Sequence, residues 1–247
     1  MIKKLIMLAI TLIIIGGIGT VITMINSNQN KEVISTPTTT NADTSSLLEK
    51  LQIQYTNSNG KTFDESFTIK TTEDTIHIRE KRKSNFQFFN SPLSSDLTIK
   101  RTSEKVKNIT IDLVSTNLTA TDLDADDLEF TSVSGDLDLT NVSARSIYLE
   151  ATSGDIDLME TTGELELNTV SGDIQLENNK LTHTIIGSSV SGDILLSFTE
   201  QPQDLKFKGD TVSGDVSFFN DNATRVETGK GLLTVQLDTV SGDITVE

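Results

Sequence analysis

From residue 108 onward, apolar and polar residues alternate with a period of two, as in the segment Val170–Leu176. Alternation of this kind, rich in Val, Ile and Leu, predicts half-buried β-strands. No stretch among these residues has the pattern of a helix of ten residues or more. The second half of the chain is therefore predicted to be all-β.

The tripeptide Ser-Gly-Asp recurs six times in this region, and successive serines are 19, 18, 20, 22 and 28 residues apart. Such regularity indicates an internal structural repeat. The six copies are Ser134, Gly135, Asp136; Ser153, Gly154, Asp155; Ser171, Gly172, Asp173; Ser191, Gly192, Asp193; Ser213, Gly214, Asp215; and Ser241, Gly242, Asp243.

The residues on either side of each tripeptide predict a corner. An apolar residue stands six positions before every serine, and apolar residues stand one and three positions after every aspartate. The inward-facing positions thus lie an even number of residues before the serine and an odd number of residues after it, so the chain must bend there. We expect glycine to supply the permissive backbone and Ser and Asp to hydrogen-bond neighbouring backbone groups.

Two short strands and two turns in roughly 20 residues cannot bury an apolar face alone, but stacked copies can. Residues 108–247 are therefore predicted to form a parallel β-helix, or β-solenoid, of about seven coils. Helical repeats do not fit the period, and a propeller would have too few blades. Residues 47–107 are predicted to be an N-terminal β cap with degenerate first coils.

The N-terminus predicts a membrane anchor. Leu5 to Ile25 contains no charged residue and, as a helix, would span about 31 Å. Lys3 and Lys4 precede it, so the positive-inside rule places residues 26–247 outside the cytoplasm. Residues 1–25 are predicted to be an uncleaved signal anchor and residues 26–46 a flexible linker. A cleaved signal peptide is the alternative, because residues 17–19 read Gly-Ile-Gly.

Composition narrows the functional classes. The net charge of −16 argues against a nucleic-acid partner. The charge is uneven: residues 70–107 hold 9 Lys/Arg and 5 Asp/Glu, whereas residues 108–247 hold 6 and 26. The absence of cysteine excludes disulfides, Cys-ligated metals and thiol nucleophiles. No metal or other cofactor is predicted.

Three features are candidates for chemistry. The repeat aspartates could share Ca²⁺ if stacked, although the favoured interpretation is that each braces its own turn. Carboxylate pairs such as Asp136 with Asp138, Asp155 with Asp157 and Glu164 with Glu166 are also found in glycan-cleaving β-helices, but here they fall on outward strand positions. The cationic and aromatic run at residues 79–89 could contact anionic lipid or polymer, or cap the first coil.

The motif V-S-G-D-[IL]-x-[IL], as in Val170–Leu176, resembles the "putative adhesin" β-helix family of bacterial proteins, which includes LiaG-like membrane proteins of cell-envelope-stress operons. The resemblance covers roughly residues 50–247. It implies a Gram-positive, membrane-anchored, extracytoplasmic domain without established enzyme activity, and it supplies no catalytic residues.

We therefore predict a non-enzymatic binding or scaffolding module of the bacterial cell envelope, with a link to the envelope-stress response. Its expected partners are the membrane, through the N-terminal helix, and an envelope protein or cell-wall polymer. A carbohydrate-active enzyme and a calcium-dependent adhesive module remain alternatives. The sequence does not specify the oligomeric state.

Overall fold

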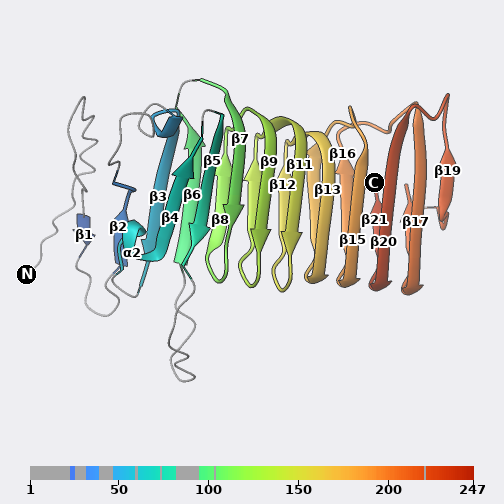
Figure 1. Cartoon of the computed structure of the whole chain (residues 1–247). Coiled ribbons are helices and arrows are strands. Elements are labelled where there is room, and N and C mark those ends of the chain that lie inside the picture. Colours follow the sequence, from blue (N-terminus) through green and yellow to red (C-terminus); the bar gives the residue numbers. More distant parts are fainter. Residues whose placement is uncertain are drawn as a thin grey trace, which may run out of the picture.

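The structure of the chain is a computed structural model that describes residues 23–25, 32–38, 47–58, 61–72, 74–81, 95–102, 104–219 and 221–247. It is an elongated stack of strands, with the N-terminal part at one end of the row (Figure 1). The described strands form two sheets that face each other across one hydrophobic core.

One sheet has 11 described strands. In spatial order they are β1 (Thr23–Ile25), β2 (Glu32–Ser35), β3 (Leu51–Asn57), β6 (Ser95–Arg101), β8 (Asn117–Thr121), β10 (Leu137–Thr140), β12 (Ile156–Met159), β14 (Ile174–Asn179), β16 (Ile194–Phe198), β21 (Ile244–Val246) and β18 (Val216–Phe218).

The second sheet has 10 described strands. In spatial order they are β19 (Arg225–Glu227), β17 (Leu205–Ser213), β20 (Leu233–Ser241), β15 (Ile185–Ser191), β13 (Thr162–Ser171), β11 (Ser143–Ala151), β9 (Ala125–Ser132), β7 (Val106–Asp112), β5 (Thr75–Glu80) and β4 (Phe67–Thr71).

From β7 onward the chain passes back and forth between the sheets, so that one strand of each makes a coil. Successive coils pair in parallel, and equivalent residues stand side by side: Leu137 is in register with Leu118 and with Ile156. These in-facing aliphatic residues are almost completely buried. The all-β, parallel two-sheet solenoid predicted from the period-two pattern and the repeat is confirmed.

The first part of the sheets is antiparallel. β2, β3 and β6 pair antiparallel in one sheet, as do β4 and β5 in the other. A single turn of helix, α2 (Phe63–Ser66), precedes β4. The rings of Tyr55, Phe63 and Phe67 pack together, with centroids 5.0 Å and 4.8 Å apart for the two pairs that include Phe67. This aromatic cluster fills the core at the N-terminal end of the stack.

The predicted membrane anchor lies mostly outside the described residues. Its last three residues, Thr23–Ile25, form β1 and pair antiparallel with β2 rather than extending a helix. Among the residues that the structure describes, no helix is both long and apolar enough to cross a bilayer. Within the segment predicted as a linker, Glu32–Ser35 forms β2 and pairs with β3.

The last two coils are stacked out of chain order. The coil of β20 and β21, residues 233–246, lies between the coil of β15 and β16 and the coil of β17 and β18. The C-terminal end accordingly lies inside the row, while β19 stands at its far end (Figure 1). This insertion explains the spacing of 28 residues between the last two repeat serines, because the chain must cross back over one coil.

The core is closely packed around the inserted coil. Four positions before the repeat serine, the inserted coil carries Leu237, which is in register with Gly187 on one side and Gly209 on the other. A Cβ added at Gly187 would lie only 3.0 Å from the Leu237 side chain. At Gly209 the space of a Cβ is taken by the ring of Phe207 and by Val216, at 2.8 Å and 2.9 Å, so larger side chains fill the core beside both glycines.

Candidate binding surface

The six Ser-Gly-Asp corners form straight columns along one edge of the solenoid. In the aspartate column, Oδ1 of each carboxylate accepts a hydrogen bond from the backbone N–H of the aspartate in the next coil. Along the stack the donor–acceptor distances are 3.0 Å for Asp155 to Asp136, 2.8 Å for Asp173 to Asp155, 2.8 Å for Asp193 to Asp173, 2.7 Å for Asp243 to Asp193 and 2.8 Å for Asp215 to Asp243.

This aspartate ladder differs from the favoured expectation, in which each carboxylate braces its own turn. The bonds run between coils and therefore stabilise stacking as well as the corner. Asn117 takes the same place in the first coil, where its Oδ1 accepts the backbone N–H of Asp136 at 3.1 Å. The ladder thus requires an oxygen acceptor, which an amide provides as well as a carboxylate.

The repeat glycines are needed for close approach more than for unusual torsion angles. A Cβ added at Gly172 would lie 2.2 Å from the carbonyl oxygen of Gly154, and the other corner glycines meet the coil before them at 2.0–2.3 Å. Among the corner glycines, only Gly214 and Gly242 have φ in the positive range, at 154° and 156°. The expectation that glycine supplies a special φ at every corner was therefore incomplete.

Two positions before the repeat serines lies a column of small residues, hydroxyl-bearing in five of the six coils, which was not identified from the sequence. The hydroxyls of Thr169, Ser189 and Thr239 each donate to the glycine carbonyl of the neighbouring coil, all at 3.2 Å. These bonds satisfy backbone oxygens that would otherwise lack partners at the bend. Aligning the repeats reveals the signal, because this position holds only Ser, Thr or Ala.

The calcium alternative predicted that stacked aspartates share cations. In the structure one oxygen of each ladder carboxylate is already engaged by a backbone N–H. Among the described residues, no group of three or more acidic or histidine side chains has a geometry that could hold a metal ion. The described geometry therefore favours a structural role for the ladder.

The valines just before the repeat serines point outward. Their side chains form an exposed column along the corner, and their exposed fractions are 47% for Val133, 50% for Val170, 49% for Val190, 49% for Val240 and 82% for Val212. Inward packing does not explain these residues. Their β-branched shape does suit the strand that leads into the corner.

The carboxylate pairs considered for catalysis lie on the outer sheet faces. Asp138 and Asp157 are in register on β10 and β12, and they line an open groove of about 350 Å³ together with Gln175 and Glu177. Partial burial, and then the nearby charge of Asp157, raise the pKa of Asp138 to about 6. Burial likewise raises the pKa of Asp157. Glu164 and Glu166 are exposed on the opposite sheet.

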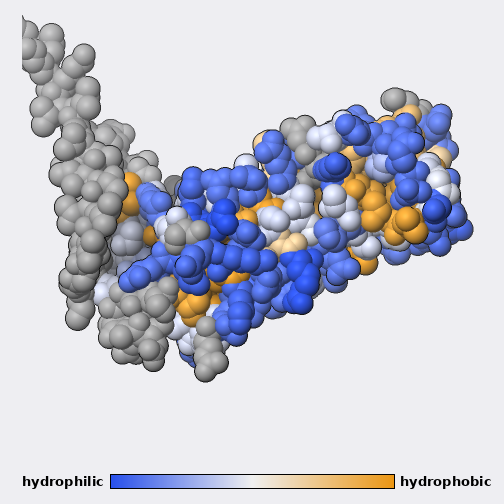
Figure 2. Space-filling view, turned by 90° about the horizontal axis from the view of Figure 1, so that it is seen from above, coloured by the Kyte–Doolittle hydropathy of each residue, from blue (hydrophilic) through white to orange (hydrophobic). Residues whose placement is uncertain are grey.

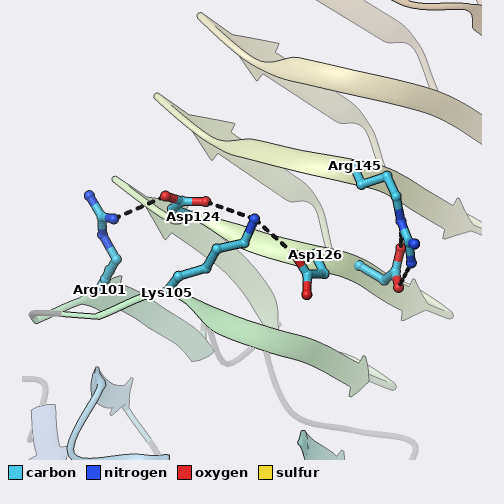
Figure 3. Close-up of polar contacts among 6 residues, drawn as sticks. Arg101, Lys105, Asp124, Asp126 and Arg145 are labelled. Atoms are coloured by element: carbon cyan, nitrogen blue, oxygen red, sulfur yellow. Dashed lines mark hydrogen bonds and ion pairs between the residues drawn. The ribbon is translucent and has the colours of Figure 1, made fainter.

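Ion pairs cross from coil to coil near the N-terminal end of the solenoid (Figure 3). Arg101 and Lys105 both contact Asp124, at 3.3 Å and 3.5 Å, and Lys105 also contacts Asp126 at 2.8 Å. Arg145 makes a bidentate pair with Asp127. Because these side chains are exposed to solvent, each pair contributes little to stability. Their main consequence is that these cations are already neutralised by the protein itself.

A second open groove, of about 500 Å³, lies on the outer face of the 10-stranded sheet. It crosses β5, β7, β9 and β11, and its lining includes Asn108, Thr110, Glu129, Ser146 and Tyr148. The Tyr148 hydroxyl donates to Oε2 of Glu150 at 2.6 Å. That bond, and then burial, raise the pKa of Tyr148 to about 12, so the hydroxyl keeps its proton.

His77 contacts Asp112 at 2.9 Å, beside Arg79, as a surface polar network. His183 is exposed and contacts Thr182. Most of the cationic and aromatic run predicted as a cap or lipid contact, from residue 82 to residue 89, lies outside the described residues.

Comparisons with known proteins place the chain in a family. A comparison with proteins of curated function finds no match. Among solved structures, a protein described as a "putative cell adhesion protein" from Clostridium sporogenes is similar, with a TM-score of 0.40 and 14% identity over 79% of this chain and 81% of that one. The family model described as Toastrack DUF4097 matches residues 20–247. The chain therefore belongs to the Toastrack DUF4097 family.

Proposed function

We propose that this protein is a non-enzymatic, adhesin-like binding module, held at the bacterial membrane by its N-terminal segment and acting outside the cytoplasm on the cell envelope. The anchor proposal rests on the uncharged segment Leu5–Ile25 and the two lysines before it. The sequence resemblance to LiaG-like proteins supports a place in the envelope-stress response.

The observation that carries the binding role is the regular array of outward side chains. Because the coils are in register, each outer position recurs along a straight row with a spacing of about 4.8 Å. One such row runs through Thr110, Glu129, Tyr148, Glu166 and Ile186. A long, periodic partner could contact several coils at once, and many weak contacts add up to firm attachment.

The enzyme alternative receives less support from the same geometry. Ladder carboxylates such as Asp136 and Asp155 are engaged in stacking. Asp138 and Asp157 face an open groove on a sheet surface rather than an enclosed cleft that excludes water. Figure 2 shows a surface on which hydrophilic residues dominate and hydrophobic patches interrupt them. A polar, solvated surface of this kind suits binding.

Co-sedimentation with purified cell-wall sacculi tests this function. The full chain in detergent is mixed with sacculi, and the fraction of protein in the pellet is compared with that of Gly172→Val, a charge-neutral change expected to disrupt the stack. We expect the native chain to pellet, the variant to stay in solution, and no soluble reducing sugar to appear. Equal pelleting of both proteins, no pelleting of either, or release of reducing sugar would contradict the proposal.

A further inference from the structure

The groove lined by Tyr148 suggests what kind of polymer the module binds, and this inference rests on the proposed binding function. We propose that the groove across β5, β7, β9 and β11 is a binding site for an uncharged, extended polysaccharide chain. The lining of the groove, its direction and the charge of the surface around it all suit this ligand.

The lining has the chemistry of carbohydrate recognition. Hydroxyls come from Thr110, Ser146 and Tyr148, an amide from Asn108 and a carboxylate from Glu129. These groups can exchange hydrogen bonds with sugar hydroxyls, which are both donors and acceptors. The Tyr148 ring adds an apolar surface whose negative face attracts the C–H groups of a pyranose ring.

The Tyr148 ring is held in place before any ligand arrives. Its hydroxyl is bonded to Glu150, and its backbone lies in the centre of β11, which pairs on both sides with β9 and β13. Holding a platform rigid reduces the entropy lost on binding.

The direction of the groove suits a linear polymer. Asn108, Asp127 and Ser146 are in register on three successive strands, and so are Thr110, Glu129 and Tyr148. Two parallel rows of polar groups therefore cross the strands, each with a repeat of about 4.8 Å. This repeat is comparable to the length of one pyranose unit in an extended chain.

The negative charge of the surface around the groove disfavours an anionic polymer as its ligand. Residues 108–247 carry 26 acidic and 6 basic residues. Of the cations beside the groove, Arg145 is paired with Asp127, and Lys107 contacts Asp74 at 2.7 Å. A phosphate-rich polymer such as a teichoic acid would meet net repulsion, whereas a neutral glycan would not.

Saturation-transfer NMR on the full chain in detergent tests this site. The probes are a β-1,4-linked N-acetylglucosamine hexamer, a β-1,4-linked glucose hexamer and poly(glycerol phosphate). We expect signal transfer to at least one of the neutral hexamers and none to the phosphate polymer. No transfer to either hexamer, or transfer only to the phosphate polymer, would overturn the inference.

Three variants locate the binding. Tyr148→Ala should raise the Kd for the bound hexamer at least tenfold, whereas Tyr148→Phe, which keeps the ring, should change it less than threefold. Val190→Ala is the control, because Val190 is also a large apolar residue, is 49% exposed on β15, and lines neither groove. Thermal unfolding checks that all three remain folded. Equal affinity of Tyr148→Ala and the native chain would overturn the site.

The outcome for the site is separable from the outcome for the function. If Tyr148→Ala pellets with sacculi as fully as the native chain, the glycan site is wrong while the envelope-binding function stands. If the native chain itself does not pellet, the proposed function fails, whatever the hexamers do.

Discussion

Truncating Leu237 to alanine should be unusually costly for a residue so near the C-terminus. Leu237 is fully buried and lies against Gly187, which has no side chain to move into the space. Leu→Ala changes in cores cost about 2–5 kcal/mol, and the cost rises with the cavity that remains. We therefore expect a loss of about 3–5 kcal/mol in the free energy of unfolding.

The control for this change is Leu149→Ala, in the equivalent position of a central coil. Leu149 is also fully buried, but its in-register neighbours are the large side chains of Phe130 and Leu167, which can relax into the gap. Equilibrium urea unfolding, followed by the circular dichroism of the sheets, measures both variants. If Leu237→Ala cost less than about 1 kcal/mol, the packing of Leu237 against Gly187 would not hold the inserted coil in place.

Three further predictions concern the corners and the outer face. Gly172→Ala should destabilise the stack by at least about 2 kcal/mol in urea unfolding, because its Cβ would overlap the Gly154 carbonyl oxygen; an unchanged midpoint would show that the coils can separate freely. Asp173→Asn should leave stability nearly unchanged, since an amide oxygen can still accept the hydrogen bond from the Asp193 N–H, whereas Asp173→Ala should cost about 1–3 kcal/mol. Millimolar Ca²⁺ should raise the melting temperature of the native chain no more than NaCl of equal ionic strength does. Folding raises the pKa of Asp138 from 3.8 to about 6, so the folded state binds the Asp138 proton more tightly than the unfolded state does. The stability that this proton contributes is present at low pH and is lost as the pH rises from about 4 to 6. Asp138→Asn should remove that decline and add about 1 kcal/mol at pH 7, and a pH profile identical to that of the native chain would contradict this.

The solenoid could be predicted from the sequence because its determinants are local. Each coil repeats the same alternation around Ser-Gly-Asp, and the change of parity at that point requires a corner. The segment with Ile109 and Leu118 has the same alternation without the tripeptide, and it forms β7 and β8. Fold class therefore followed from residue spacing alone.

The order of the last coils could not be predicted because it depends on contacts between coils. All six repeats have compatible corners, so either coil could follow β15 and β16 by its motif. In the observed order Leu237 packs against Gly187, a contact that can be recognised only after the register is known. The long interval before Ser241 was the visible sign, but it indicates an extra excursion without saying where the chain returns.

The candidate binding groove was missed for a related reason. Tyr148, Glu129 and Asn108 are far apart in sequence and share no motif, and they meet because parallel pairing places them on adjacent strands. Sequence reasoning instead emphasised the repeated aspartates, which the structure uses for stacking. Repetition in a solenoid thus marks what every coil needs, whereas a ligand site occupies positions that do not repeat.

The solenoid is proposed to work outside the cytoplasm, and labelling a single cysteine in intact cells tests this location most directly. The chain contains no cysteine, so Ile186→Cys, at an exposed position of β15, introduces a unique thiol. A membrane-impermeant maleimide is added to intact cells expressing this variant, and to the same cells after lysis. We predict equal labelling before and after lysis. Labelling that occurs only after lysis would place the solenoid in the cytoplasm and contradict the proposed function.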